Sequence, residues 1–315
     1  MQYIDALSKV LPVLLLLLLG AVLNRTQFLL PGTIQEIKKL VINISLPAVL
    51  FLAFARAAFQ PGYLIIVALV FTACLLVLFF GRLIQPLTRI QSPYFPALLT
   101  GFEAGMIGYA IFSAVYGTEH VFKFAIVDLG QVTFVFFVLV PVLERISAGP
   151  RPFSTTLINF FRTPVILAIL GGIIANQVGL VARLGTQPVA NSLLVTLEVI
   201  AGLTMPLVAV VIGYEMRLQR GSLSKPALTI AVRLACWLPL GVLFSTLVIG
   251  RLLGLDPVFQ AALLTLFILP PPFVIPLFIP DASEDQRTYV VNSLSLGTLV
   301  TLIAFAIVGG LYPAG

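Results

Sequence analysis

Three consecutive prolines, Pro270, Pro271 and Pro272, lie inside an uncharged stretch that runs from Pro257 to Pro280. A stretch of this length can cross a bilayer as a helix. Each proline lacks a backbone donor and clashes with the preceding helical turn, so this stretch cannot be one continuous helix. Backbone groups freed at membrane depth find partners only in packed protein or in a water-filled cavity. The sequence therefore predicts a helix that is broken inside the membrane.

The composition is typical of an integral membrane protein. Hydrophobic residues make up 60% of the chain and charged residues only 10%, and uncharged runs recur along its whole length. A soluble domain has about one-quarter charged residues. We expect an all-α membrane protein with ten spans and no soluble module. The predicted spans lie near residues 8–24, 35–56, 61–82, 94–116, 121–143, 160–179, 189–214, 225–250, 257–280 and 287–311.

The basic residues indicate an orientation. The loops after odd-numbered spans, with the span ends beside them, hold most of the eighteen lysines and arginines. By the positive-inside rule these loops are cytoplasmic, so both termini face outward from an inner or plasma membrane. The net charge of +6 is scattered over short loops instead of gathered in one patch, which gives no indication of nucleic acid binding.

An internal repeat relates the two halves of the chain. Three sets of residues occur in the same order in both halves: Pro12, Gly20 and Asn24 with Pro164, Gly172 and Asn176; Leu46-Pro47 with Met205-Pro206; and Ala97–Phe102 with Ala262–Phe267. Their offsets are 152, 159 and 165 residues, a drift that loop insertions would produce. We therefore predict one five-span repeat in residues 1–145, a short cytoplasmic connector in 146–159 and a second repeat in 160–315. An odd number of spans gives the two repeats opposite topologies.

Span four is the candidate for a second broken helix. It contains Gly101, Gly105 and Gly108 around an acid, Glu103, and Met106 follows in the same stretch. When the two repeats are aligned, this stretch corresponds to the three prolines of span nine. Two broken helices that meet near the midplane direct their half-helix ends at a shared point. N-terminal ends there favour anions and C-terminal ends favour cations.

At these residues the chain resembles the auxin efflux carrier family, which includes the plant PIN proteins and bacterial candidate carriers of malate and malonate. The matching motifs extend along the chain: Leu11-Pro12-Val13, Leu18-Leu19-Gly20, Leu46-Pro47-Ala48, Gly105-Met106-Ile107-Gly108, Met205-Pro206-Leu207 with Gly213, and the proline break of span nine. The resemblance implies a ten-span inverted repeat with a scaffold domain and a transport domain, each drawn from both repeats. It also implies elevator-like transport of small organic anions and allows a homodimer through the scaffold. PIN proteins typically have an asparagine near the crossing of span four, where this chain has Glu103.

Acids inside the predicted spans are the strongest candidates for function, because they are expensive to bury and usually face a cavity or a partner. Glu103 either binds a coupling ion or proton, or accepts hydrogen bonds from backbone freed at the break. Asp128 and Gln131 are about one helical turn apart in span five and face the same side. Together with Glu103 they form a candidate site for a proton or a sodium ion, whereas the alternative places Asp128 near the end of its span.

The remaining candidates are polar groups and backbone near the two breaks. We expect the substrate to contact Gly101, Glu103, Gly105, Met106, Gly108, Pro270, Pro271, Pro272, Phe273, Asn43 and Ser45. Asn292, Ser293 and Ser295 in span ten join the candidate ion site. For these polar residues, and for the glycines, helix packing is the alternative role. Arg233 and Glu198 either pair inside the membrane or, as we favour, have structural or interfacial roles, with Arg233 reaching towards the cytoplasmic surface.

The leading hypothesis is a secondary transporter of a small, carboxylate-bearing organic anion, coupled to protons, to sodium or to neither. A bile-acid-type sodium symporter and an anion channel are the alternatives. An enzyme is disfavoured, because the chain has one histidine, no His-Glu-x-x-His zinc motif and no Walker A sequence. We expect no cofactor and no metal site beyond a coupling sodium ion or proton, and the anion and the lipid bilayer as partners.

Overall fold

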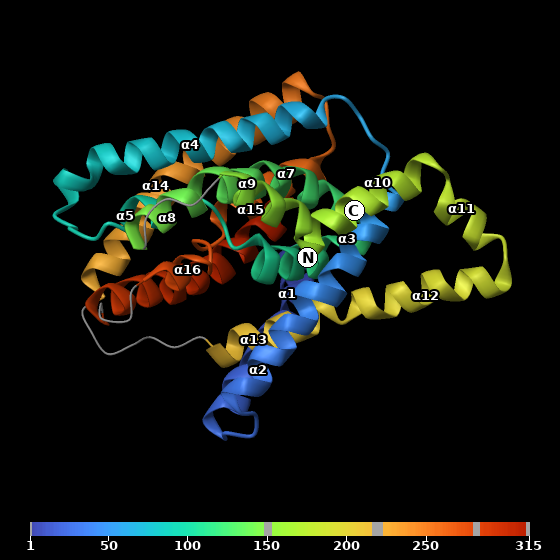
Figure 1. The fold of residues 1–315 in the computed structure, drawn as a ribbon, viewed down its shortest axis with the longest axis horizontal. Coiled ribbons are helices and arrows are strands. Elements are labelled where there is room, and N and C mark those ends of the chain that lie inside the picture. The colour runs from blue at the N-terminus through green and yellow to red at the C-terminus, as the bar shows by residue number, and fades with distance from the viewer. Residues whose placement is uncertain (1, 148–152, 216–222, 280–283, 313–315) are drawn as a thin grey trace.

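The computed structural model describes residues 2–147, 153–215, 223–279 and 284–312, which are helical apart from short connections (Figure 1). Among the described residues, seven helical segments are long and apolar enough to cross a membrane: Pro31–Ala55, Tyr63–Thr88, Phe95–Tyr116, Thr118–Ser147, Asn191–Glu215, Ser224–Leu252 and Glu284–Leu311. Leu11–Arg25, Pro164–Gln177 and Pro257–Ile268 are shorter apolar helices. The chain is thus an all-α protein of membrane-spanning character. The count of ten spans stays a prediction, because the apolar parts described for these last three helices are shorter than a usual span of about 20 residues.

The described residues of the first half form eight α-helices and four shorter helical turns. In order they are α1 (Gln2–Arg25), α2 (Pro31–Leu40), η1 (Val41–Ser45), α3 (Leu46–Ala55), α4 (Tyr63–Thr88), α5 (Phe95–Leu99), η2 (Ala104–Gly108), α6 (Tyr109–Tyr116), η3 (Thr118–His120), α7 (Val121–Phe134), η4 (Val135–Leu139) and α8 (Val140–Ser147). The turn η1 is a wider, π-helical turn just before Pro47, which cannot donate to the preceding turn.

The remaining helices belong to the second half of the chain. It contains α9 (Phe153–Arg162), α10 (Pro164–Gln177), α11 (Leu180–Gly185), α12 (Pro188–Gly202), α13 (Thr204–Glu215), α14 (Ser224–Leu243), η5 (Phe244–Leu252), α15 (Pro257–Ile268), η6 (Ile275–Phe278) and α16 (Glu284–Leu311). Part of the predicted connector, residues 148–152, lies outside the described residues. The described part of the connector, from Phe153 onwards, is helical, and α9 ends before α10 begins at Pro164.

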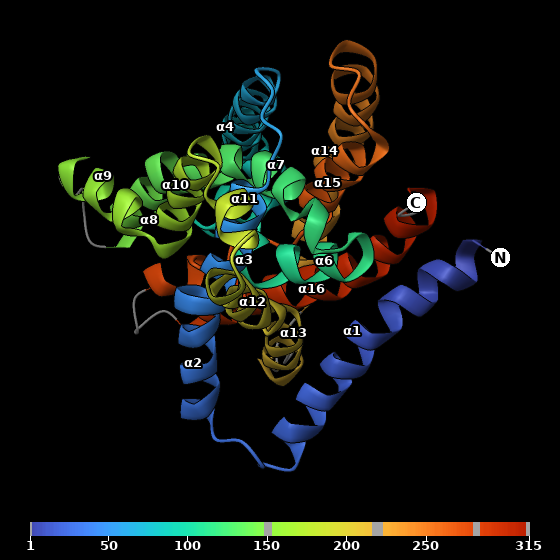
Figure 2. The same ribbon diagram turned by 90° about the vertical axis from the view of Figure 1, so that its right-hand side faces the viewer.

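Two helix pairs pack closely enough that only glycine fits between them. The helix α1 runs along the outside of the molecule against α13 (Figure 2). A Cβ at Gly20 would overlap the carbonyl oxygen of Val210, and one at Gly213 would overlap that of Leu17. The helices α10 and α3 form the second pair, in which a Cβ at Gly172 would lie 2.7 Å from the carbonyl oxygen of Phe51. Backbones at this distance gain dispersion contacts that larger residues would prevent.

The remaining helices surround the two interrupted segments. The helix α4 packs against α5 and α7, and α14 packs against α15 and α16, while α7 also contacts α15. As a result the interruption after α5 and the interruption after α15 are both buried at the centre of this group, where Leu98, Leu99 and Leu269 are almost without exposure. This arrangement brings backbone groups from the interruptions of the two segments into contact with each other.

Candidate functional site

The break in span four is a short extended segment between α5 and η2. After Leu99 the chain is extended at Thr100, and Gly101 then adopts a left-handed conformation with φ +65°. A Cβ at Gly101 would also lie 2.8 Å from Cγ of Pro272. Glycine is thus required there by both conformation and space. The predicted break is present, and it spans residues 100–103, so that Gly105, Met106 and Gly108 belong to the helical half that follows.

The break in span nine coincides with the three prolines. The helix α15 ends at Ile268, and Leu269 is extended with ψ 153°, as expected for a residue that precedes a proline. The chain then passes through the buried Pro270, Pro271 and Pro272 to Phe273 and resumes as the single turn η6. The sequence-based prediction of a broken helix is therefore confirmed.

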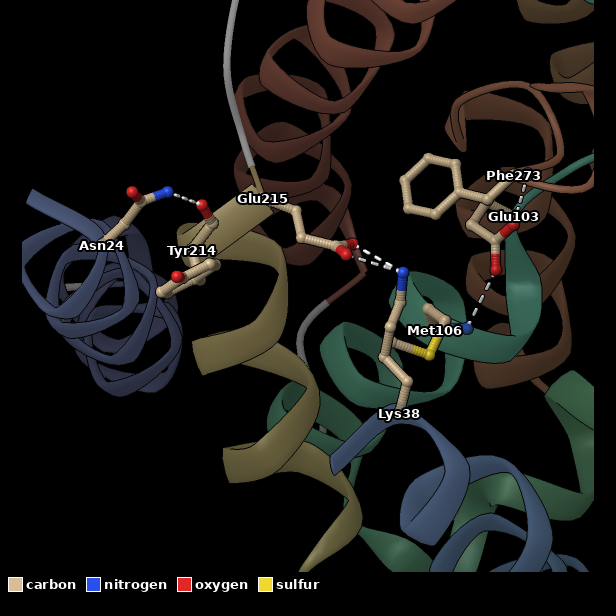
Figure 3. A network of polar contacts seen from close by, with 7 residues as sticks. All are labelled: Asn24, Lys38, Glu103, Met106, Tyr214, Glu215 and Phe273. Carbon is tan, nitrogen blue, oxygen red and sulfur yellow. Dashed lines mark hydrogen bonds and ion pairs between the residues drawn. The ribbon is translucent and has the colours of Figure 1, made fainter. Parts of the chain in front are cut away.

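Glu103 makes hydrogen bonds to both interrupted segments. Its backbone N–H donates to the carbonyl oxygen of Pro270 at 3.0 Å. Its carboxylate accepts one hydrogen bond from the N–H of Met106, Oε1 to N 3.1 Å, and another from the N–H of Phe273, Oε2 to N 2.7 Å (Figure 3). Hydrogen bonds of N–H groups to a charged acceptor are stronger than neutral ones. The carboxylate thus supplies negative charge where the second half of span four begins.

The two breaks meet at a point that we call the crossing. Arg233 lies on the side of the crossing away from Glu103, where backbone carbonyl oxygens gather. It lies on α14 with 2% of its surface exposed and donates to the carbonyl oxygens of Leu98, Gly101 and Leu269. The interpretation that it serves the interface with water is wrong, because it is buried. It does not pair with Glu198, whose carboxylate binds Arg56 at 2.5 Å.

Two further side chains satisfy carbonyls at the same half-helix ends. Trp237, one turn beyond Arg233 on α14, donates from Nε1 to the carbonyl oxygen of Leu99 at 2.7 Å. Thr301 on α16 donates from its hydroxyl to the carbonyl oxygen of Ile268 at 2.5 Å. Backbone groups at helix ends must find partners in a water-free interior. These donors explain how the breaks are tolerated.

Asp128 and Gln131 form a buried network directly behind the break of span four. Asp128 accepts from the hydroxyl of Tyr109 and from Nε2 of Gln131, each at 2.8 Å. Gln131 in turn accepts from the backbone N–H of Phe102 at 3.2 Å. The structure therefore brings the predicted pair to the break, and connects it to the residue that precedes Glu103.

The other predicted polar residues are dispersed. Asn292 and Ser293 are fully buried in α16, where the Ser293 hydroxyl donates to the carbonyl oxygen of Tyr289. Ser295, two residues beyond Ser293, lines a cavity. Asn43 is exposed and donates to the carbonyl oxygen of Lys39, and Ser45 is buried. Neither Asn43 nor Ser45 lines that cavity.

The cavity has a volume of about 510 Å³ and lies beside the crossing. It is lined by Pro31, Ile34, Gln35, Lys38, Ile212, Tyr214, Glu215, Phe273, Pro276, Leu277, Val291, Leu294, Ser295 and Thr298. Lys38 and Glu215 form an ion pair in its wall, with Nζ to Oε2 at 2.7 Å (Figure 3). Both side chains are partly exposed, at 23% and 32%. The cavity is mainly apolar with one such charged pair, a composition that suits a ligand site.

Sequence reasoning did not single out Lys38 or Glu215 for this cavity. Lys38 is one of the basic residues near a span end, and such residues usually report orientation. Its partner is 177 residues away. The only local signal is that an acid ends α13 where the chain leaves the apolar stretch.

No family model matches the chain, and no curated protein is significantly similar to it. The resemblance drawn from the motifs therefore stays a prediction. Within the described residues no group of three or more histidines, cysteines or acids gathers as a metal site would require. The crossing and the cavity beside it are therefore the features that indicate a function.

Proposed function

We propose that this protein is a secondary transporter that carries a small organic, carboxylate-bearing anion across the membrane by elevator-like alternating access. The observation that carries the proposal is the contact between two interrupted helical segments beside a cavity of about 510 Å³. Interrupted helices at membrane depth are found where they line a substrate or ion pathway. Phe273, which belongs to the break of span nine, lines this cavity and connects the two features.

The repeated contacts of the two halves support an inverted repeat of five plus five spans. Asn24 of α1 donates to the carbonyl oxygen of Tyr214, and Asn176 of α10 donates to that of Ala55 at 2.9 Å. The two asparagines are 152 residues apart and their acceptors are 159 residues apart, which are the offsets found in the sequence. Gly20 and Gly172 show the same two offsets. They are 152 residues apart, and the residues that they face, Val210 and Phe51, are 159 residues apart.

The packing also supports a division into two moving parts. On this proposal the scaffold consists of the glycine-packed pairs α1 with α13 and α3 with α10, together with α2 and α12. The transport part consists of α4 to α8 and α14 to α16, which surround the crossing. The cavity lies between them: Lys38 and Glu215 come from the scaffold, whereas Phe273 and Ser295 come from the transport part. A substrate bound there would contact both parts, as an elevator requires.

Lys38 is the group that we assign to the substrate carboxylate. It is the lysine that lines the cavity, and its present partner Glu215 is itself partly exposed. An arriving carboxylate can take the place of Glu215 on the ammonium group, while water solvates the released acid. The loops beside this cavity follow odd-numbered spans, so the charge pattern predicts that it opens to the cytoplasm.

Uptake into liposomes tests the proposal. Purified wild-type protein is reconstituted, and uptake of malate, malonate and indole-3-acetate is measured with imposed proton and sodium gradients. We expect saturable uptake of at least one of these carboxylates. Loss of a charge-assisted hydrogen bond in Lys38→Met should weaken the apparent affinity by about tenfold or more. The control is Lys39→Met, which removes an exposed lysine that pairs only with Glu36 on the surface.

Two results would overturn the proposed function. One is the absence of uptake of any of these carboxylates by folded protein under every gradient. The other is a current far larger than carrier turnover permits, which would identify a channel. Equal uptake by the Lys38→Met and Lys39→Met variants would remove the role that we assign to Lys38.

A further inference from the structure

Arg233 binds carbonyl oxygens that come from two different half-helices. Its Nη1 donates to Leu98 at 3.1 Å, and its Nη2 donates to Gly101 at 2.6 Å and to Leu269 at 3.0 Å. Leu98 and Gly101 lie at the end of α5, and Leu269 lies at the end of α15. One guanidinium group therefore bridges the carbonyl ends of both interrupted helices.

The surroundings of this guanidinium are those of a cation site. Unpaired carbonyls at helix ends carry partial negative charge, and carbonyl oxygens are ligands that hard cations prefer. The ring of Phe102 lies 4.8 Å from the central carbon of Arg233, a cation–π distance. None of the ion pairs found among the described residues involves Arg233. Its positive charge is accordingly directed at backbone oxygens and an aromatic face.

We propose that Arg233 is a built-in cation at this crossing, which takes the place that a coupling ion would occupy, so that the carrier needs no sodium ion there. In transporters the unwound carbonyls and C-terminal ends of half-helices coordinate sodium or receive protons. Here a covalently attached group fills that position and makes several hydrogen bonds to it. This inference rests on the proposed transport function and refines its coupling: the carbonyl side of the crossing has a permanent cation.

The chain contains its own reporter for this position. Trp237 is its single tryptophan, lies one helical turn from Arg233 and donates to the neighbouring carbonyl of Leu99. Its ring is 4.7 Å from that of Phe102, which also contacts Arg233. A cation that binds between these carbonyls should therefore change the tryptophan emission.

The experiment uses Arg233→Ala, which removes the charge and leaves space, and Arg233→Met, which removes the charge and fills the space. The control Thr301→Val removes a neutral donor from the carbonyl of Ile268 at the same helix ends. Tryptophan emission and the apparent Tm in detergent are recorded during titration with methylguanidinium and with sodium. N-methyl-D-glucamine serves as the ionic-strength control. Methylguanidinium is kept at about 10 mM, far below denaturing guanidinium concentrations.

We expect the Arg233→Ala variant to melt about 10 °C below wild type, since the carbonyl ends lose their charged partner. Methylguanidinium and sodium should each raise its Tm and change its emission in a saturable manner. Arg233→Met and Thr301→Val should be less stable than wild type and show neither response. Wild-type protein should show no saturable response to sodium, and its uptake should be equal in sodium and in N-methyl-D-glucamine.

The inference is overturned if Arg233→Ala folds but responds to no cation, which would make Arg233 only a structural donor. It is also overturned if wild-type protein itself shows a saturable sodium response at Trp237. The wild-type titration decides the question even if the alanine variant does not fold. Because emission and Tm require no transport, a failure of the proposed substrate class would leave these results unchanged and can be recognised separately.

Discussion

The carboxylate of Glu103 is held by two backbone donors, so its replacement by glutamine has a calculable effect. The wild-type side chain accepts from Met106 at 3.1 Å and from Phe273 at 2.7 Å. Glutamine offers one acceptor oxygen and one amino group, so it can satisfy only one of these N–H groups. One charge-assisted hydrogen bond is lost, at a cost of about 2 kcal/mol. For a chain of this size that corresponds to a decrease in Tm of about 6 °C.

Thermal unfolding of purified Glu103→Gln in detergent measures this loss. The matched control is Glu36→Gln, in which an exposed acid paired with Lys39 is changed in the same way. Its effect should stay below about 0.5 kcal/mol, because exposed ion pairs contribute little. A Glu103→Gln variant as stable as wild type would refute the bridging role. In liposomes the same variant should change the pH dependence of uptake, and an unchanged pH dependence would remove Glu103 from coupling.

Three further substitutions test other parts of the structure. Gly213→Ala places a methyl group against the carbonyl oxygen of Leu17, so we expect it to lower the free energy of unfolding by about 3 kcal/mol or to prevent accumulation of the protein. The control Gly202→Ala has open space around it and should be neutral or slightly stabilising in thermal unfolding. Asp128→Leu removes both hydrogen bonds that the carboxylate accepts and leaves the Tyr109 hydroxyl and the Gln131 amide without that acceptor, so it should lose about 2 kcal/mol or more; a wild-type Tm would contradict this network. Pro271→Ala should change stability by no more than about 1 kcal/mol, since its neighbours keep the break; a larger loss would show that each proline is needed separately.

The broken helix of span nine could be predicted because its cause is local. Three prolines in a row forbid a helix whatever surrounds them, and the structure places the break at those residues. The glycines of span four gave the correct segment but not the correct position within it. Of Gly101, Gly105 and Gly108, only Gly101 has a positive φ, and a Cβ there would lie 2.8 Å from Cγ of Pro272. That contact joins residues far apart in the sequence, so the pattern of glycines could not show it.

The partners of the buried charges could not be predicted, because they are separated widely in the sequence. Arg233 is eight residues beyond Lys225, which suggested a residue near the membrane surface. Its acceptors lie 132, 135 and 36 residues away, on helix ends that exist only once both breaks have formed. Asp128 and Gln131 were predictable as a pair, since one helical turn separates them, whereas their contact with Phe102 depends on the fold.

The two charges at the crossing limit how a substrate anion can bind. Displacing Glu103 would free two N–H groups for the anion, but it would leave a partly buried carboxylate without its donors, at a cost of several kcal/mol. If the anion instead replaces Glu215 on the ammonium group of Lys38, the carboxylate that loses its partner is that of Glu215. This side chain is 32% exposed and can be solvated. The lower-cost route is therefore binding in the cavity, with Glu103 and Arg233 maintaining the crossing. The double variant Lys38→Met/Glu215→Gln tests this step: it should keep wild-type stability within about 1 kcal/mol, as for a partly exposed ion pair, and show the weakened apparent affinity expected for Lys38→Met. If it transports normally, the substrate must bind at the crossing itself.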